Sequence, residues 1–343
     1  MKGKAAVLGL DRKISIIEKE IPEPKEDEVL INVKACGVCR TDHHIYHGQF
    51  NIKQPVVLGH EFSGIVVKVG KKVRNFKEGD IVAAHPIISC GECEYCVSGH
   101  SNLCENAKVL GGAGEDIYDG GFQEYTIVPE KNLRKFNNKV DFEEAAFAEP
   151  LGCAVRGIQK SRLSLGEKVL IVGAGPMGLL LVQLASIYGA SMIIVSEIDE
   201  QKRKIAEQLG AHITVNPKEV NVPEFVKDIT KGGVELAIEA VGKVETFETA
   251  FKSLKKMGRA MIFGVPGDTA EYSIPLFPIY YEEYEIIGSY AVSYESFNIA
   301  VELLNNKRVN VKPLISHRFK LEEILSAFDL MDKNVGLKKM IKI

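Results

Sequence analysis

The sequence predicts an α/β protein with two domains, a doubly wound parallel sheet and a second, β-rich domain of barrel-like form. Its 343 residues are enough for two domains with separate cores. Up to about residue 150, short apolar runs alternate with turn residues, whereas from Lys168 strand-like and helix-like segments alternate. We therefore expect residues 1–150 and 293–343 to form the β-rich domain and residues 151–292 to form the parallel-sheet domain.

The expected elements follow from the apolar patterns. In the β-rich part, strand-like runs cover residues 29–38, 62–70, 80–87 and 120–129, and the end of the chain adds a helix near 296–306 and a strand at 338–343. In the parallel-sheet part, the alternating segments are 168–172, 177–189, 191–199, 200–210, 235–242, 248–258 and 260–267. This alternation predicts helices on both faces of one sheet.

Charge and cysteine content exclude several classes of protein. A net charge of -3 and a pI near 6.3 argue against general binding to nucleic acid or to an anionic membrane. The first residues lack the apolar run of a signal peptide, so we expect a cytoplasmic protein. Seven cysteines in a reducing compartment favour metal binding over disulfides, and Cys36 and Cys153 are interpreted as small buried hydrophobic residues.

A glycine-rich turn follows the predicted strand 168–172 and opens a helix. It fits G-x-G-x-x-G, and its expected cofactor-binding residues are Gly173, Gly175, Pro176, Met177 and Gly178. The spacing places a pyrophosphate at the helix N-terminus.

An acidic residue, Glu197, ends the next predicted strand. It would bind the ribose hydroxyls of NAD and repel the 2'-phosphate of NADP. Lys202 and Arg203 follow it, and their positive charges could instead bind the 2'-phosphate of NADP. Lys202 is a candidate cofactor contact. NAD is the favoured cofactor.

Four cysteines form a compact C-x2-C-x2-C-x7-C cluster, made of Cys90, Cys93, Cys96 and Cys104. Four thiolates close a tetrahedral shell around zinc, so this cluster predicts a structural zinc site. A zinc ribbon for nucleic acid has similar spacing, but acidic neighbours such as Glu92 and Glu94 argue against it.

A second zinc site is predicted from Cys39, His60 and Glu61, which offer a thiolate, an imidazole and a carboxylate. Such a mixed set leaves one zinc position for a substrate, so we expect catalytic zinc here. Five of the other histidines are interpreted as hydrogen-bonded surface residues: His47, His85, His100, His212 and His317.

These motifs together resemble the zinc-dependent alcohol and polyol dehydrogenases of the medium-chain dehydrogenase/reductase family. The resemblance runs along almost the whole chain. It rests on Cys-x-Thr-Asp-x-His from Cys39 to His44, Gly-His-Glu-x2-Gly-x5-Gly-x2-Val from Gly59 to Val73, the four-cysteine cluster, Glu149-Pro150-Leu151 and the glycine turn. It implies a GroES-like catalytic domain beside a Rossmann domain.

The resemblance also implies roles for individual residues. Cys39 and His60 would be ligands of the catalytic zinc, with Glu61 or Glu149 as the third ligand and Asp42 orienting His60. Thr41 and His44 would carry the substrate proton. Tyr46 and Tyr290 are candidates for the substrate pocket, although core packing is an equal alternative for each.

The activity implied is reversible, NAD-dependent oxidation of a polyol, sugar alcohol or other secondary alcohol, with two zinc ions per subunit. L-threonine 3-dehydrogenase is the alternative enzyme, because its motifs resemble the same residues. A non-catalytic nucleotide-binding relative is the alternative from another class. We expect a small-molecule substrate, no nucleic-acid or membrane partner, and a homo-oligomer, either a tetramer or a dimer.

Overall fold

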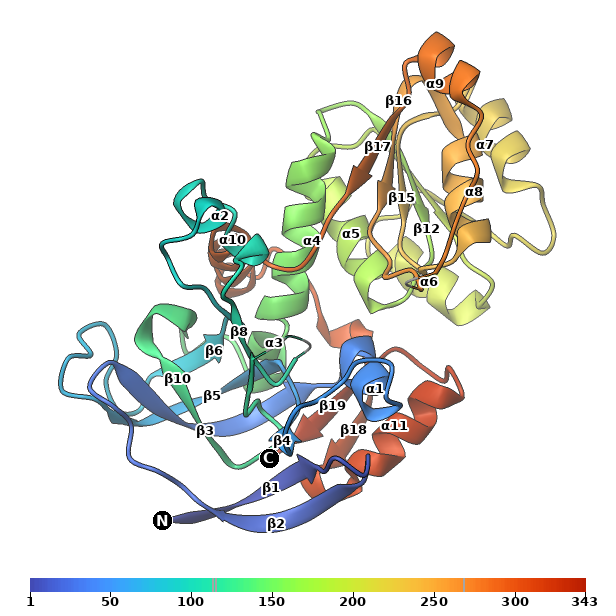
Figure 1. The fold of residues 1–343 in the computed structure, drawn as a ribbon. Helices are drawn as coiled ribbons and strands as arrows, with labels where there is room; N and C mark the ends of the chain where they lie inside the picture. Colours follow the sequence, from blue (N-terminus) through green and yellow to red (C-terminus); the bar gives the residue numbers. More distant parts are fainter. Residues whose placement is uncertain (113, 115, 268) are drawn as a thin grey trace. The chain divides into compact units, whose positions relative to one another are not determined.

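The computed structural model describes residues 1–343 except 113, 115 and 268. The chain divides into two compact units (Figure 1). The β-rich unit contains Met1–Gly152 and Val292–Ile343, and the parallel-sheet unit contains Cys153–Ala291. Helix α4 (Ala148–Ser161) crosses from one unit into the other.

The β-rich unit is built around a seven-stranded sheet in the order β11-β6-β5-β3-β19-β18, with β10 also paired to β3. The strands of this sheet are β3 (Glu28–Gly37), β5 (Glu61–Val69), β6 (Ile81–Ala84), β10 (Tyr125–Pro129), β11 (Leu133–Phe136), β18 (Ile315–Lys320) and β19 (Lys338–Lys342). Strand β19 pairs antiparallel with β3, with Ile341 opposite Cys36, so the end of the chain completes the N-terminal sheet.

Two three-stranded sheets and several helices complete this unit. The sheets have the orders β2-β1-β4 and β7-β8-β9. Their strands are β1 (Lys2–Leu8), β2 (Ile14–Glu20), β4 (Val56–Val57), β7 (Ile87–Ile88), β8 (Lys108–Leu110) and β9 (Asp116–Tyr118). The helices are α1 (Arg40–Tyr46), α2 (Glu94–Val97), α3 (Phe142–Ala146), α10 (Tyr294–Asn305) and α11 (Ile324–Asp332), with single 3₁₀ turns η1 (Ser101–Leu103), η2 (Glu130–Asn132), η3 (Lys312–Leu314) and η4 (Leu321–Glu323).

The parallel-sheet unit has six parallel strands in the order β14-β13-β12-β15-β16-β17. Numbered from β12, this is the 3-2-1-4-5-6 order of dinucleotide-binding folds. The strands are β12 (Lys168–Val172), β13 (Met192–Ser196), β14 (Ile213–Val215), β15 (Val234–Glu239), β16 (Leu254–Ile262) and β17 (Glu285–Gly288). The predicted combination of a doubly wound sheet with a β-rich domain is confirmed.

Helices cover both faces of this sheet, as the alternating pattern predicts. Figure 1 shows α4 and α5 on one side of the strands and α7 and α8 on the other. These helices and their neighbours are α5 (Pro176–Ile187), α6 (Glu200–Gln208), α7 (Val222–Thr230), α8 (Val244–Lys252) and α9 (Leu276–Glu282). Val226, Phe247 and Phe251 pack on strand residues such as Leu170 and Ile194 in one apolar cluster. Within the described residues, no helix combines the length and the apolar character that crossing a bilayer requires.

One segment differs from its sequence pattern. The run 248–258 reads as one helix, but α8 ends at Lys252 and β16 begins at Leu254. The backbone N–H of Val234 donates to the Ser253 carbonyl at 3.0 Å, so the chain joins the sheet directly after the helix ends. A register shift follows, and Met257 adopts a positive φ of 61°.

Candidate active site and metal centres

The predicted catalytic ligands converge where β3 leads into α1 and β5 begins. Cys39 is the N-cap of α1, and Glu61 is the first residue of β5. Because Gly37 and Glu61 face each other across the β3–β5 pair, the two segments lie side by side. Ligand atoms of Cys39, His60 and Glu61 all lie within 4.8 Å of one another.

Buried Asp42 holds this arrangement together. One of its carboxylate oxygens accepts from the Cys39 backbone N–H at 2.8 Å, and the other accepts from Gly59 at 3.3 Å. His60 Nδ1 lies 3.3 Å from Asp42 Oδ1, outside hydrogen-bond geometry. The Asp42 carboxylate therefore faces Nδ1 of the ring, as does a carboxylate that orients a metal-binding histidine.

The charges around His60 suit a cation. Burial works to lower the pKa of His60, but the charges of Asp42 and Cys39 outweigh burial and raise it well above its usual range. The pocket therefore stabilises positive charge beside this ring. A thiolate, an imidazole and a carboxylate are donors that zinc accepts, so the residues present fit a bound zinc ion.

Lys338 is a buried residue of this site that sequence reasoning missed. From β19, its Nζ donates to both Glu61 carboxylate oxygens, at 2.7 and 2.6 Å, and it lies 3.3 Å from the Val38 carbonyl. Burial works to lower the pKa of Lys338, but Glu61 and the Cys39 thiol outweigh it and raise the pKa. The only indication in the sequence was a lysine pair, Lys338 and Lys339, in an otherwise apolar closing strand.

The other predicted residues are more dispersed. Buried Glu149, in the first turn of α4, lies outside the group formed by Cys39, His60 and Glu61 but close enough for its charge to act on Lys338. Thr41 and His44 both lie on α1. Burial and the nearby charge of Arg40 lower the pKa of His44, whose ring stacks near Phe50 with centroids 5.9 Å apart.

The two pocket tyrosines belong to different units. Tyr46 stacks on Phe328 at 4.9 Å and packs against the core of the β-rich unit. Tyr290 is exposed near the end of the parallel-sheet unit. The cysteines outside the metal sites also differ, since Cys36 is buried and Cys153 is half-buried.

The four-cysteine cluster forms a second group of metal donors. Cys90, Cys93, Cys96 and Cys104 offer sulfur atoms that all lie within 4.8 Å of one another. Backbone N–H groups near Glu92 and Cys93 lower the pKa of Cys90 to about 6, whereas burial raises the pKa of Cys96 to about 12. Four neighbouring thiols become four thiolates only around a cation, so the donor set fits zinc.

A buried polar cluster formed around His85, five residues before Cys90, corrects one interpretation. His85 is fully buried rather than a surface residue, and its Nδ1 pairs with the Ile87 carbonyl at 3.0 Å. Its ring stacks on Tyr294 at 4.3 Å, and the Asn132 side chain donates to the His85 and Ile87 carbonyls at 2.9 and 2.8 Å. Burial lowers the pKa of His85 to about 4.

The glycine turn has the geometry that a bound pyrophosphate needs. Gly173 has a φ of +103°, and a Cβ on Gly178 would lie 2.0 Å from the Gly173 carbonyl oxygen. A Cβ on Gly175 would meet no atom within 4 Å, so this face of the turn is open. Pro176 and Met177 start α5 with Gly175 as its N-cap, so the turn leads into a helix N-terminus, which favours a phosphate.

Glu197 follows β13 and contacts the same turn. Its carboxylate accepts from the Ala174 backbone N–H at 2.8 Å and from Asp199 at 3.0 Å. Arg203 donates to the backbone carbonyls of Glu197 and Ile198, at 2.8 and 3.0 Å. The Asp199 side chain caps α6 by accepting from the Lys202 backbone N–H at 3.0 Å.

Sequence reasoning also missed Glu239, a buried acid at the end of β15. Its Oε1 accepts from the backbone of Val241 and Gly242 and from the Thr246 hydroxyl, at 2.7 to 2.8 Å. It therefore fixes the turn after β15, where the Val241 side chain lies against Gly173.

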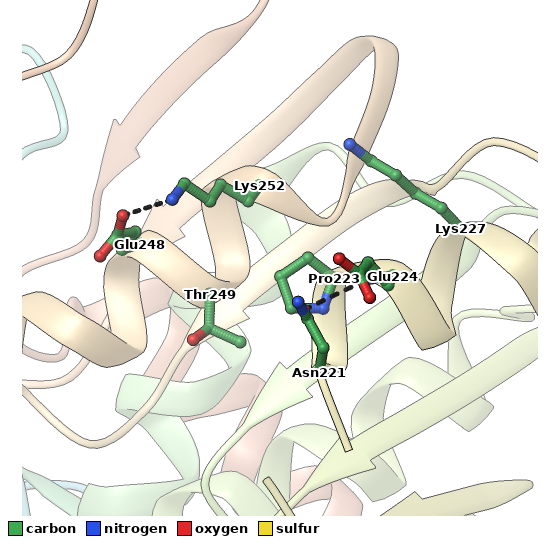
Figure 2. Close-up of a pocket in the computed structure, with 7 residues that line it drawn as sticks. All are labelled: Asn221, Pro223, Glu224, Lys227, Glu248, Thr249 and Lys252. Atoms are coloured by element: carbon green, nitrogen blue, oxygen red, sulfur yellow. Dashed lines mark hydrogen bonds and ion pairs between the residues drawn. The ribbon is translucent and has the colours of Figure 1, made fainter.

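A surface pocket of the parallel-sheet unit lies between α7 and α8 (Figure 2). It is lined by Asn221, Pro223, Glu224, Lys227, Glu248, Thr249 and Lys252. Lys252 pairs with Glu248, and Asn221 caps α7 through the Glu224 N–H. None of its lining residues is a predicted site residue, and we assign it no role in the reaction.

Fold and site together define a zinc-binding oxidoreductase with a nicotinamide cofactor. The alcohol dehydrogenase GroES-like domain matches residues 25–138, and the zinc-binding dehydrogenase domain matches residues 176–306. The chain belongs to the zinc-dependent medium-chain dehydrogenase/reductase family, and within it to the alcohol and polyol dehydrogenases that act on small-molecule alcohols.

Individual relatives agree with this placement. The chain is 34% identical to sorbitol dehydrogenase of Halalkalibacterium halodurans, over 95% of each chain. It is 36% identical to L-threonine 3-dehydrogenase of Pyrococcus horikoshii, over 92% of this chain and 91% of that one. A solved zinc-binding dehydrogenase from Sinorhizobium meliloti, bound to NADP, superposes with a TM-score of 0.93 at 34% identity over all of both chains.

Proposed function

We propose that the chain oxidises a secondary alcohol of a polyol or sugar alcohol to the ketone, with NAD as acceptor and one catalytic zinc. The convergence of Cys39, His60 and Glu61 within 4.8 Å carries this proposal, because the set suits zinc with a position left for substrate. Bound there, zinc supplies a Lewis acid that lowers the pKa of the substrate hydroxyl, and NAD supplies the hydride acceptor.

The chain's own residues would hold the metal and move the proton. Cys39 and His60 bind, and Asp42 keeps the His60 ring oriented through the contact at 3.3 Å. Thr41 would relay the proton: its hydroxyl accepts the substrate proton as its own proton passes toward His44, whose ring takes it up and releases it to solvent. The lowered pKa of His44 keeps its ring neutral near pH 7, so that it is able to take the proton.

We propose that Glu149 moves in beside Cys39 and His60 when zinc binds and is the resting third ligand, with Glu61 as an exchanging one. Both oxygens of Glu61 already accept from Lys338, so binding zinc through Glu61 requires breaking a buried ion pair. Glu149→Gln should therefore lower zinc content and activity more than Glu61→Gln does. An equal zinc content in the two variants would contradict this order.

We propose NAD as the preferred cofactor because Glu197 places a carboxylate beside the glycine turn. Arg203 is held by backbone carbonyls, which makes it a poor partner for a 2'-phosphate. Glu197→Ala should narrow the ratio of kcat/KM for NAD over NADP. A higher kcat/KM with NADP in the unmutated protein would contradict the proposal.

The test of the activity is a screen that follows NADH absorbance with polyols, aldonates, L-threonine and simple secondary alcohols. Cys39→Ser and His60→Ala should abolish turnover and leave NADH binding intact, whereas Cys153→Ala should be mild. Robust oxidation by the Cys39→Ser protein would refute metal activation. L-threonine is the second candidate substrate, because the chain is about as similar in sequence to a threonine dehydrogenase, at 36% identity, as to a sorbitol dehydrogenase, at 34%.

We also propose a homo-oligomer, a dimer or a tetramer. Strand β17 is an edge of the six-stranded sheet, and Ile286 on it is exposed. Leu276, Phe277 and Tyr280 of α9 are exposed as well. Such edges and apolar patches are commonly covered by a partner. Light scattering should give at least twice the subunit mass, and Ile286→Asp should lower it; a monomeric wild type would overturn the proposal.

A further inference from the structure

A third group of metal-type donors lies on the surface of the β-rich unit, apart from both predicted zinc sites. It consists of His43, His47 and Asp332. The histidines are four residues apart, His43 inside α1 and His47 at its C-cap, so their side chains lie on one face. Asp332 is the last residue of α11. None of the three has a role in the proposed reaction.

The two imidazoles converge on a single carboxylate oxygen. His43 Nε2 lies 2.7 Å and His47 Nε2 3.0 Å from Asp332 Oδ1. The two rings are tilted toward each other with centroids 4.4 Å apart, and the three donor atoms lie within 4.8 Å of one another. Ligands about 2.0 Å from a tetrahedral zinc ion are roughly 3.3 Å apart. The two nitrogen–oxygen distances differ from this value by roughly 0.6 and 0.3 Å, and the two nitrogens lie within 4.8 Å of each other.

The charges around the group also favour a cation. The hydrogen bond from His43, followed by the charge of His47, lowers the pKa of Asp332, so this carboxylate is anionic. Two cationic side chains that are close in sequence have other partners, since Arg40 donates to Asn334 at 3.3 Å and Lys333 to Asp329 at 2.7 Å.

The exposure of the donors points to an exchangeable site. The side chains of His43, His47 and Asp332 are 13%, 40% and 45% exposed, so water can reach the group and fill a fourth position. Two imidazoles and one carboxylate form a set typical of zinc, nickel or copper rather than of magnesium or calcium.

We propose that His43, His47 and Asp332 form an additional site for a divalent transition metal of the zinc type. A metal bound there joins α1 to α11. These helices already contact each other through Tyr46 and Phe328. Because α1 also carries Cys39 at its N-cap and Thr41 in its first turn, the ion would stiffen the helix that begins at the catalytic ligand.

The test uses the purified zinc-loaded protein and Ni²⁺ as the probe. Equilibrium dialysis at pH 7.5, with metal analysis, should show one Ni²⁺ more per subunit in the wild type than in His47→Ala or Asp332→Asn. Losing a direct ligand should raise the apparent Kd by more than the roughly 10- to 100-fold that outer-shell changes cost. Ni²⁺ should also raise the Tm of the wild type and leave that of both variants unchanged.

Two control variants remove the same chemical groups elsewhere. His100→Ala removes an exposed histidine, and Asp329→Asn removes a carboxylate one turn earlier on α11. Both should bind Ni²⁺ like the wild type. Equal Ni²⁺ binding by the wild type, His47→Ala and Asp332→Asn would overturn the proposal, as would an equal loss in the two controls. Alcohol oxidation is not part of the readout, so the proposed reaction is tested separately.

Discussion

Replacing Lys338 by methionine removes the counter-charge of Glu61 while keeping a long apolar side chain in the sheet. Both partners are buried, and Lys338 Nζ donates to the two Glu61 oxygens at 2.7 and 2.6 Å. The variant leaves a carboxylate without its cation in the interior of the β-rich unit. We therefore expect a large loss of stability.

The expected loss is about 3 to 5 kcal/mol, which is the cost of breaking a buried ion pair by removing one partner. For a unit of roughly 200 residues, this corresponds to a fall in Tm of roughly 6 to 20 °C.

The assay is thermal unfolding after mild chelation, because a bound cation would itself pair with the released Glu61. Lys342→Met is the matched control on the same strand, since Lys342 lies 3.9 Å from Glu143 at the surface and should contribute little. The double variant Glu61→Gln with Lys338→Met should recover about 2 kcal/mol relative to Lys338→Met. A loss below about 1 kcal/mol in Lys338→Met, with no recovery in the double variant, would show that the pair is not the internal counter-charge described above.

Three further predictions follow from the described residues. Burial lowers the pKa of His85 to about 4 in the folded state, against about 6.5 in the unfolded state, so its contribution to stability is present above pH 6.5 and is lost as the pH falls toward 4. The free energy of unfolding of His85→Phe should therefore fall by roughly 3 kcal/mol less than that of the wild type over this pH range. Parallel curves of unfolding free energy against pH for the two proteins would contradict this. Gly175→Ala should weaken NADH binding at least about tenfold and cost less than about 1 kcal/mol of stability. Gly178→Ala should instead lower the Tm clearly, because its Cβ meets the Gly173 carbonyl. Equal Tm values for the two variants would refute these roles of the two glycines. Graded chelation, followed by metal analysis, should remove zinc from the site of Cys39 and His60 before it removes zinc from the four cysteines. Simultaneous loss of both ions would contradict the contrast between an open and a closed coordination shell.

Much of the fold was predictable because local patterns and global topology agree. Strand β12 occupies the predicted residues 168–172, and the glycine turn and α5 follow in the expected order. The pattern misled at residues 248–258 because strand pairing competes with the helix there. The Val234 backbone N–H donates to the Ser253 carbonyl, and the end of the apparent helix becomes β16. A run of mixed Lys and apolar residues carries no indication of that switch.

The grouping of the candidate metal donors was predictable for a different reason. Cys39, His60 and Glu61, like the four cysteines, belong to short motifs whose residue types and spacing match zinc chemistry. The interpretation of His85 was wrong because burial depends on Tyr294, which lies more than two hundred residues further along the chain and stacks on the imidazole. Isolated histidines give no local sign of such a partner.

Lys338 and Asp332, which sequence reasoning did not connect with the donors, share one property: the placement of a distant strand or helix decides their role. Lys338 and Lys339 are neighbours in β19, and pairing of Ile341 with Cys36 on β3 sets which side chains meet the start of β5. A shift by one residue would turn Lys338 to the opposite face and leave Glu61 without a counter-charge. Asp332 likewise reaches His43 and His47 only because α11 packs on α1 through Phe328 and Tyr46. The C-terminal segment thus supplies the charges that complete the N-terminal donor sets, and a motif search confined to residues 39–61 could find the donors but not the charges that balance them.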